Sequence, residues 1–220
     1  MQHSRAYDLL MRLPLLGWSI FCTIMSANGL ARYVREADPA LPDAAYAINI
    51  AMRLSAIAFL VLLAASVILR DRPSGKASGF EPRISALLGT LAVYTFSLFP
   101  RREISPAEEI VSTLLILVGT VAAVYVLTHL GRSFSVMAEA RRLVTSGVYR
   151  IVRHPLYLAE ELAVIGIFMQ FASLWTAVLL AMQIAFQLRR MHNEEAVLSE
   201  IFPEYATYKA NTARLIPGIY

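Results

Sequence analysis

Ionisable and aromatic residues border an apolar segment in the last third of the sequence. Residues 146–160 read SGVYRIVRHPLYLAE, so Arg153, His154, Tyr157 and Glu160 stand immediately before or within that apolar segment. Burying such side chains costs free energy unless partners or a polar ligand satisfy them. We therefore interpret this stretch as a candidate binding or catalytic site at a membrane boundary.

A second polar cluster follows the same apolar segment and contains Arg189, Arg190, His192, Glu194 and Glu195. Arg190 and Glu194 are four residues apart, so they share one face of a helix. The two clusters together offer carboxylate, guanidinium, imidazole and phenol groups, which suit a zwitterionic ligand such as S-adenosylmethionine. A ring of interfacial Arg and Tyr anchors with surface ion pairs explains the same residues equally well. Residue types alone leave both interpretations open.

The rest of the sequence predicts an integral membrane protein. Of the 220 residues 57% are hydrophobic and only 16% are charged, and the mean hydropathy is +0.56. A membrane helix needs roughly 20 apolar residues, and uncharged runs of about that length occupy 13–30, 54–69, 84–100, 110–130 and 162–188. We expect an all-α fold, a polytopic transmembrane helical bundle of about five to six membrane helices.

The fifth apolar run is too long for one comfortable span and too short for two full ones. Proline is favoured at the first position of a helix, so we expect a helix to begin at Pro155, turn near residues 170–173 and return to Arg190 as a short helical hairpin. A single long span would instead send the basic tail to the opposite side of the membrane.

With the hairpin, four segments share one side: the N-terminus, the 70–83 loop, the 131–154 loop and the tail after residue 188. They hold most of the Lys and Arg residues, so the positive-inside rule predicts a cytoplasmic catalytic loop and tail. The chain is expected to be a single domain, with four N-terminal spans in 1–130 and the catalytic loop, hairpin and cofactor-binding tail in 131–220.

Several classes of site are not expected. Cys22 is the only cysteine, which excludes an intrachain disulfide and a thiolate metal cluster. The four histidines, His3, His129, His154 and His192, form no HExxH pair, so we expect no metal. The basic residues lie in short loops between apolar runs, which indicates orientation in the bilayer and not a nucleic-acid partner.

The C-terminal third resembles a known membrane enzyme superfamily. The matching elements are residues 143–150 (LVTSGVYR), 153–157 (RHPLY), Arg190, Glu194, Glu195, Phe202, Glu204, Tyr205, Tyr208, Ile216 and Pro217. In combination they resemble the isoprenylcysteine carboxyl methyltransferase and phospholipid methyltransferase superfamily over about residues 130–220. One departure is Ala159, because the family often has Gly two residues after the motif tyrosine.

This resemblance implies a membrane-embedded, S-adenosylmethionine-dependent methyltransferase that uses no Rossmann fold, and the chain indeed has no GxGxxG. It implies a catalytic role for Arg190 and Arg153, with Arg190 also facing the substrate. The residues that it implies for cofactor binding are Arg141, Arg142, Leu143, Val144, Tyr149, His154, Pro155, Leu156, Tyr157, Glu194 and Glu195.

The acceptor depends on the chemistry of the nucleophile. Methyl transfer from a sulfonium needs chiefly alignment and exclusion of water. A carboxylate is already ionised and an Arg such as Arg190 can hold it, whereas an amine must first lose a proton. We expect a lipid or prenylated small-molecule or protein acceptor, most favourably a prenylcysteine-like carboxylate. The alternatives are phospholipid amine N-methylation, a non-catalytic lipid- or anion-binding protein or transporter, and a membrane reductase that binds NADPH.

Overall fold

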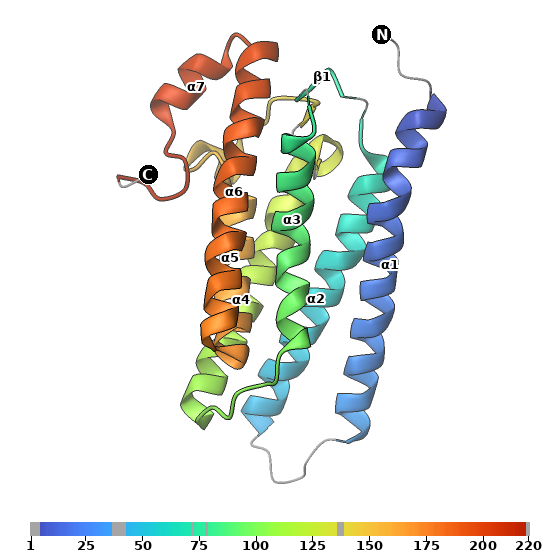
Figure 1. The fold of residues 1–220 in the computed structure, drawn as a ribbon, viewed down its shortest axis with the longest axis vertical. Helices are drawn as coiled ribbons and strands as arrows, with labels where there is room; N and C mark the ends of the chain where they lie inside the picture. The colour runs from blue at the N-terminus through green and yellow to red at the C-terminus, as the bar shows by residue number, and fades with distance from the viewer. Residues whose placement is uncertain (1–4, 37–42, 72, 78, 136–138, 219–220) are drawn as a thin grey trace.

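The computed structural model describes residues 5–36, 43–71, 73–77, 79–135 and 139–218, and these residues form an all-α bundle (Figure 1). Two short strands, β1 (Gly75–Lys76) and β2 (Glu139–Ala140), cap one end. The helices within the described residues are α1 (Arg5–Arg35), α2 (Asp43–Leu69), α3 (Glu81–Thr95), α4 (Pro106–Leu130), α5 (Pro155–Phe171), α6 (Leu174–Ile201) and α7 (Tyr205–Asn211).

Three helices in the described part of the chain are long and apolar enough to cross a membrane: Arg12–Arg35, Ala44–Leu69 and Pro106–Ser133. The helices α3 and α5 have 15 and 17 residues, and α6 has 28 residues with a charged second half. All of them run alongside the three long helices in Figure 1. The predicted all-α membrane fold is confirmed, and the short helices complete the bundle.

The expected hairpin is present in the structure. Pro155 is the first residue of α5, and α5 ends at Phe171. Ser173 then caps α6: its hydroxyl accepts a hydrogen bond from the Thr176 backbone N–H at 3.2 Å, while the Thr176 hydroxyl accepts from the Ser173 N–H at 2.8 Å. This reciprocal cap satisfies two backbone donors at the turn. The helix α6 runs past Arg190 to Ile201, so the second polar cluster is helical.

Loops that are distant in sequence meet at one end of the bundle. The Asp71 N–H donates to the Arg132 carbonyl at 2.9 Å, and β1 pairs antiparallel with β2, with Gly75 opposite Ala140. The tail joins them through a parallel bridge between Val152 and Ala213. Figure 1 shows β1, α7 and the start of α1 at this same end. The loops expected to share a side of the membrane therefore lie at the same end of the bundle.

Close packing of α4 against α5 fixes the start of the hairpin. A Cβ atom on Gly119 of α4 would lie 2.7 Å from the Ala159 carbonyl oxygen and 2.6 Å from the Ala163 nitrogen, so only glycine fits there. Ala159, the departure from the family pattern, is buried at this contact. Gly119 on α4, and not a glycine at position 159 of α5, thus permits the close approach of the two helices.

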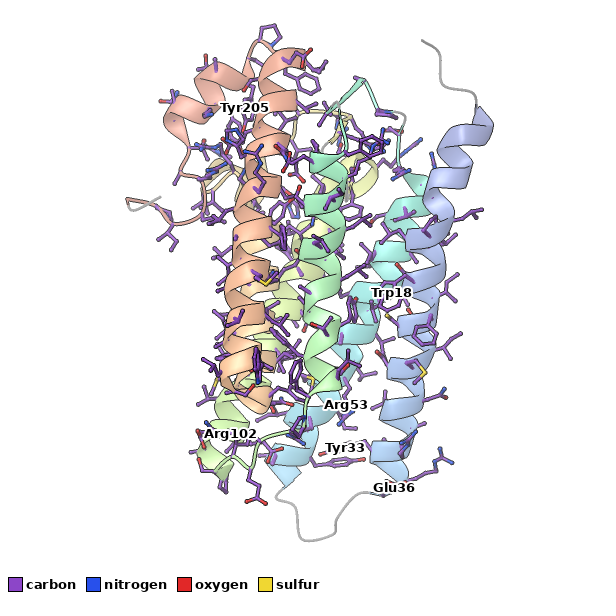
Figure 2. All side chains as sticks on the ribbon, in the orientation of Figure 1. Trp18, Tyr33, Glu36, Arg53, Arg102 and Tyr205 are labelled. Carbon is purple, nitrogen blue, oxygen red and sulfur yellow. The ribbon has the colours of Figure 1, made fainter. Side chains whose placement is uncertain are left out.

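At the opposite end of the bundle, Arg53 of α2 pairs with an aromatic ring of α1. Its guanidinium carbon lies 4.5 Å from the centroid of the Tyr33 ring, which stacks on Tyr46 (Figure 2). A cation held over an aromatic face is stabilised without a carboxylate partner. This charge within an apolar helix therefore has a structural explanation far from the polar loops.

Candidate functional site

One open cavity lies among the converging loops, the start of α5, the charged part of α6, and α7. It brings together most of the residues singled out by the sequence. Those that line it are Arg141, Arg142, Leu143, Val144, Tyr149, Arg153, His154, Leu156, Tyr157, Arg190 and Glu194. Pro155 and Glu195 are not part of the lining: Pro155 begins α5, and Glu195 lies behind the cavity wall.

A tight turn directs the motif tyrosine into the cavity. Gly147 has φ +61°, and a Cβ atom there would lie 2.7 Å from Cδ2 of His129. Both the left-handed backbone and the nearby imidazole therefore require glycine. The turn leads into a short 3-10 helix in which Tyr149 is buried. His129 packs against this turn and against the Tyr125 ring, which gives it a structural role.

Arg190 is a buried cation that faces the cavity with spare hydrogen-bond donors. The residue is 6% exposed, its Nε lies 3.6 Å from Glu194 Oε1, and its guanidinium carbon lies 4.9 Å from the Tyr157 ring centroid. The Tyr157 hydroxyl donates a hydrogen bond to Glu194. The Arg190 Nε has no hydrogen-bond partner among the described residues. A buried guanidinium of this kind is suited to an anionic ligand group.

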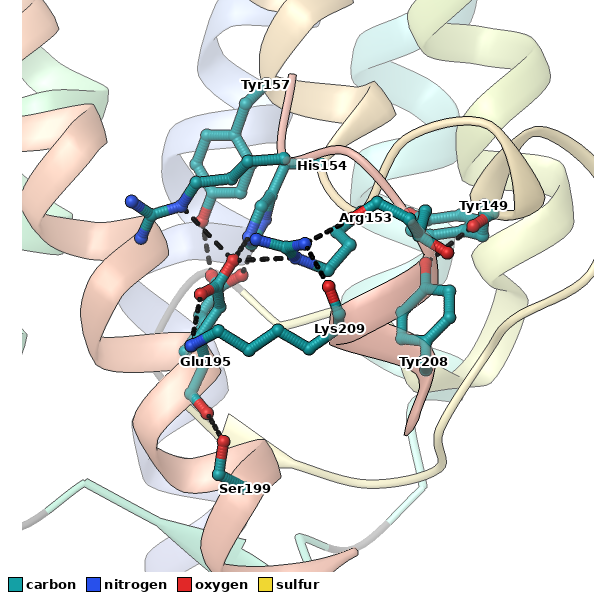
Figure 3. A network of polar contacts seen from close by, with 11 residues as sticks. Tyr149, Arg153, His154, Tyr157, Glu195, Ser199, Tyr208 and Lys209 are labelled. Atoms are coloured by element: carbon teal, nitrogen blue, oxygen red, sulfur yellow. Dashed lines mark hydrogen bonds and ion pairs between the residues drawn. The ribbon is translucent and has the colours of Figure 1, made fainter. Parts of the chain in front are cut away.

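Glu195 stands at the centre of an ion network behind this wall (Figure 3). Its Oε1 lies 3.0 Å from His154 Nε2, 3.1 Å from Arg153 Nε and 3.2 Å from Arg214 Nε, and its Oε2 lies 3.2 Å from Lys209 Nζ. An ionised carboxylate can only accept, so Nε2 of His154 carries the proton in this contact.

The charge of Glu195 is strongly favoured. Burial alone would raise its pKa, but the hydrogen bond from His154 and the charges of His154, Arg214 and Arg153 outweigh that effect and hold the pKa of Glu195 well below its ordinary value. Glu195 therefore stays ionised at neutral pH, and its contacts hold the ring of His154 at the edge of the cavity.

Arg153 binds the tail of the chain. Besides Glu195, its guanidinium donates to the Lys209 carbonyl at 2.9 Å and to the Thr212 carbonyl, and its backbone N–H donates to the Ala213 carbonyl at 2.8 Å (Figure 3). These contacts fasten α7 and the tail over the cavity. The Nε and Nη1 groups of the side chain predicted to act in catalysis thus donate to protein groups.

Sequence reasoning missed part of the lining: Leu130, Ser133, Phe134, Ser135, Glu139 and Leu198. One signal was available for Glu139, which stands two residues before Arg141, because this spacing puts both side chains on one face of an extended strand. In the structure they form an ion pair, and the Ser135 hydroxyl donates to Glu139 at 2.8 Å. The apolar members carry no comparable signal.

Comparison with known proteins gives an independent test of the resemblance. Residues 107–205 match the model of the phospholipid methyltransferase family. Two bacterial relatives are similar over part of the chain. The cobalt-zinc-cadmium resistance protein CzcN of Cupriavidus metallidurans is 35% identical over 78 residues, which cover 35% of this chain and 36% of the relative. The nickel-cobalt-cadmium resistance protein NccN of Alcaligenes xylosoxydans xylosoxydans is 30% identical over 82 residues, 37% of this chain and 38% of the relative.

The matches with these relatives span little more than a third of each relative's own length. The family match runs from the start of α4 to the first residue of α7 and contains the hairpin, Arg190, Glu194 and Glu195. It begins earlier than the resemblance seen in the sequence, so it also includes the helix that packs on α5. Residues 107–205 of this membrane protein therefore match a phospholipid methyltransferase domain of the isoprenylcysteine and phospholipid methyltransferase superfamily.

Proposed function

We propose that the chain is a membrane-embedded methyltransferase that uses S-adenosylmethionine to methylate a lipidic or amphipathic acceptor. The observation that carries this proposal is the buried Arg190, which lines a cavity together with Glu194 and Tyr157 and whose Nε has no hydrogen-bond partner among the described residues. Methyltransferases of this family generally use S-adenosylmethionine, which supports the same choice of donor.

The residues around the cavity fit this donor. Arg142 matches a carboxylate, Glu194 matches an ammonium group, and the rings of Tyr149, Tyr208 and Phe134 offer apolar faces for a purine. Burial raises the pKa of Tyr208 to about 12, although the charge of Arg153 opposes this shift and that of Glu195 adds to it. The phenol is therefore neutral at physiological pH. It donates to the Tyr149 carbonyl at 2.6 Å, which ties α7 to the cavity wall.

The division of work among the chain's own groups follows from their contacts. S-adenosylmethionine, when bound, supplies an electrophilic methyl group for in-line displacement. Arg190 holds an anionic group, Glu194 and the Tyr157 hydroxyl orient the polar part of a ligand, and Leu156 with Leu198 excludes water. Arg153, His154 and Glu195 hold the wall and the tail in position.

For the acceptor we propose a prenylcysteine-like carboxylate, because Arg190 can bind it bidentately without proton transfer. The second candidate is a phospholipid amine, which the description of the matching family favours. In that case Glu194, at the cavity, is the group positioned to take the proton that the amine must lose. We further propose that the cavity and tail face the cytosol, as the distribution of Lys and Arg indicates.

Calorimetric titration of the purified chain with S-adenosylhomocysteine and with NADPH tests the donor. The proposal expects binding of the first and none of the second. Binding of NADPH alone would favour a reductase, and binding of neither would favour a non-catalytic membrane protein or a transporter.

The role of Arg190 is tested with the variant Arg190→Ala and a matched control, Arg189→Ala. Arg189 is a suitable control because it is half-exposed and pairs with Glu81 outside the cavity.

Transfer of labelled methyl groups to the two acceptor classes tests the acceptor. Prenylcysteine should give a base-labile, volatile label, because a methyl ester releases methanol in base, whereas a methylated amine retains its label. Arg190→Ala should reduce ester formation by raising KM for the acceptor, and Arg189→Ala should preserve it. Equal loss in both variants would remove the assignment of Arg190 to the acceptor.

A further inference from the structure

A row of polar side chains continues from the cavity into the apolar part of the hairpin. Gln183 Nε2 of α6 donates to Glu161 Oε1 of α5 at 2.7 Å, and Gln187 Nε2 donates to Glu160 Oε2 at 3.3 Å. Gln183 is fully buried and Gln187 is 4% exposed. None of the four lines the cavity itself. We call these four residues the polar seam.

The polar seam has more hydrogen-bond acceptors than donors. Glu161 Oε2, Gln183 Oε1 and Gln187 Oε1 are buried and have no hydrogen-bond partner among the described residues. Both glutamine amides already donate to the glutamates, so each presents a spare oxygen. Unpaired buried oxygens cost free energy, most of all in an apolar surrounding. The site is therefore complementary to a group that brings N–H or O–H donors.

The spacing on α6 makes the polar seam an extension of the cavity. Arg190, Gln187 and Gln183 follow each other at intervals of three and four residues, so they share one helix face. Seven residues of helix correspond to about 10 Å along its axis. The direction is toward the hairpin turn and hence into the membrane.

Side chains, and not close backbone packing, separate α5 from α6. The helix α5 packs closely against α4, and α6 packs closely against α3, whereas α5 and α6 approach each other closely at few points. Long Glu and Gln side chains fill the space between them. A ligand that extends from the cavity along this face would therefore move these side chains and would not have to separate tightly packed helices.

We propose that the polar seam is a second subsite for the methyl acceptor and binds a hydrogen-bond-donating group in the acceptor's apolar body, about 10 Å along α6 from the level of Arg190. The inference rests on the proposed function. It favours, within either class of acceptor, molecules that carry an amide N–H or a hydroxyl beyond the headgroup, and a plain isoprenyl chain would leave the polar seam unfilled. An ester at the same depth offers only acceptor oxygens, which would face Glu161 Oε2 and Gln183 Oε1 unfavourably.

Matched synthetic amphiphiles test this subsite. Four single-chain probes of equal length end in a primary amine or a carboxylate, and each head is joined to the chain by an amide or by an ester about 10 Å away. The full chain in phosphatidylcholine nanodiscs is assayed for transfer of labelled methyl groups. We expect kcat/KM for the amide probe to exceed that for its ester by roughly tenfold, as a buried unpaired polar group implies.

Two variants and one control separate the subsite from general stability. Glu161→Gln adds two N–H donors to the polar seam, and Gln183→Leu removes a spare oxygen, so both should bring the amide-to-ester ratio close to one. Gln170→Leu is the control, because Gln170 donates to the Ser112 hydroxyl at 2.8 Å at the far end of α5, and it should keep the wild-type ratio.

The outcomes distinguish this inference from the proposed function. Equal use of amide and ester probes by the wild-type chain overturns the subsite but leaves a methyltransferase. Binding of S-adenosylhomocysteine without methylation of any probe also overturns it. Absence of S-adenosylhomocysteine binding refutes the proposed function itself.

Discussion

Replacing Glu195 by Gln tests whether the ion network holds the tail on the cavity. The change keeps the shape of the side chain but removes the charge that faces Arg153, Arg214 and Lys209. The side chains of Glu195, Arg153 and Arg214 are only 6%, 10% and 15% exposed, so the change removes a carboxylate charge that faces two largely buried cations. Breaking a buried pair costs about 3–5 kcal/mol. We expect the lower end, about 3 kcal/mol, because Arg153 keeps its bonds to the Lys209 and Thr212 carbonyls.

Thermal unfolding in lipid-containing micelles measures the effect on the stability of the whole chain. A loss of about 3 kcal/mol in unfolding free energy corresponds to a fall in Tm of roughly 6–12 °C. Hydrogen exchange in α7 and the tail measures the local effect and should rise. Lys209→Met is the matched control, since Lys209 is 49% exposed and a surface pair contributes at most about 1 kcal/mol. The reasoning would be refuted by a Tm of Glu195→Gln equal to that of the control, with tail exchange unchanged.

Three further predictions concern pH, the division of roles and the turn. Because the folded pKa of Glu195 is depressed, its contribution to stability is present above the unfolded pKa of about 4.3 and is lost as pH falls toward the folded pKa. Between pH 7 and pH 3, the Tm of the wild-type chain should therefore fall more steeply than the Tm of Glu195→Gln. Parallel curves of Tm against pH would contradict this prediction. Glu194→Ala should weaken S-adenosylhomocysteine binding roughly tenfold, whereas Arg190→Ala should chiefly raise KM for the acceptor. If both variants changed donor binding and acceptor KM in the same way, the two residues would not have separate roles. Gly147→Ala should destabilise the chain by about 1–3 kcal/mol, which is measured as a lower Tm. Adding His129→Ala should partly restore the Tm, because it removes the imidazole that the new Cβ would contact. A Tm that stays low in the double variant would show that this contact is unimportant.

Much of the fold followed from local sequence signals, whereas most of the residues that line the site followed from the family resemblance. Pro155 marked the start of α5, and the length of the fifth apolar run predicted the turn that Ser173 caps. Those signals work because they act within a few residues. Since the hairpin turn brings α6 back alongside α5, it also explains why residues as distant as Tyr157 and Glu194 meet.

Other features depend on contacts between distant segments and left no such signal. The pairing of β1 with β2 joins two-residue strands whose composition does not mark them as strands. The spare oxygen of Gln183 becomes evident only when Glu161 is placed opposite it. Arg153 was assigned to catalysis from the family resemblance, and its bonds to carbonyls of a tail 56 and 59 residues away could not be read from the sequence.

The short ladder between β1 and β2 limits how the chain can be divided. A fragment that starts at residue 107 would retain the whole matched family segment. It would lose the Ser74 N–H that binds the Ala140 carbonyl and the Asp71 carbonyl that binds Arg141. Transplanting the hairpin and tail onto other membrane helices would therefore require grafting the connection that follows α2 as well.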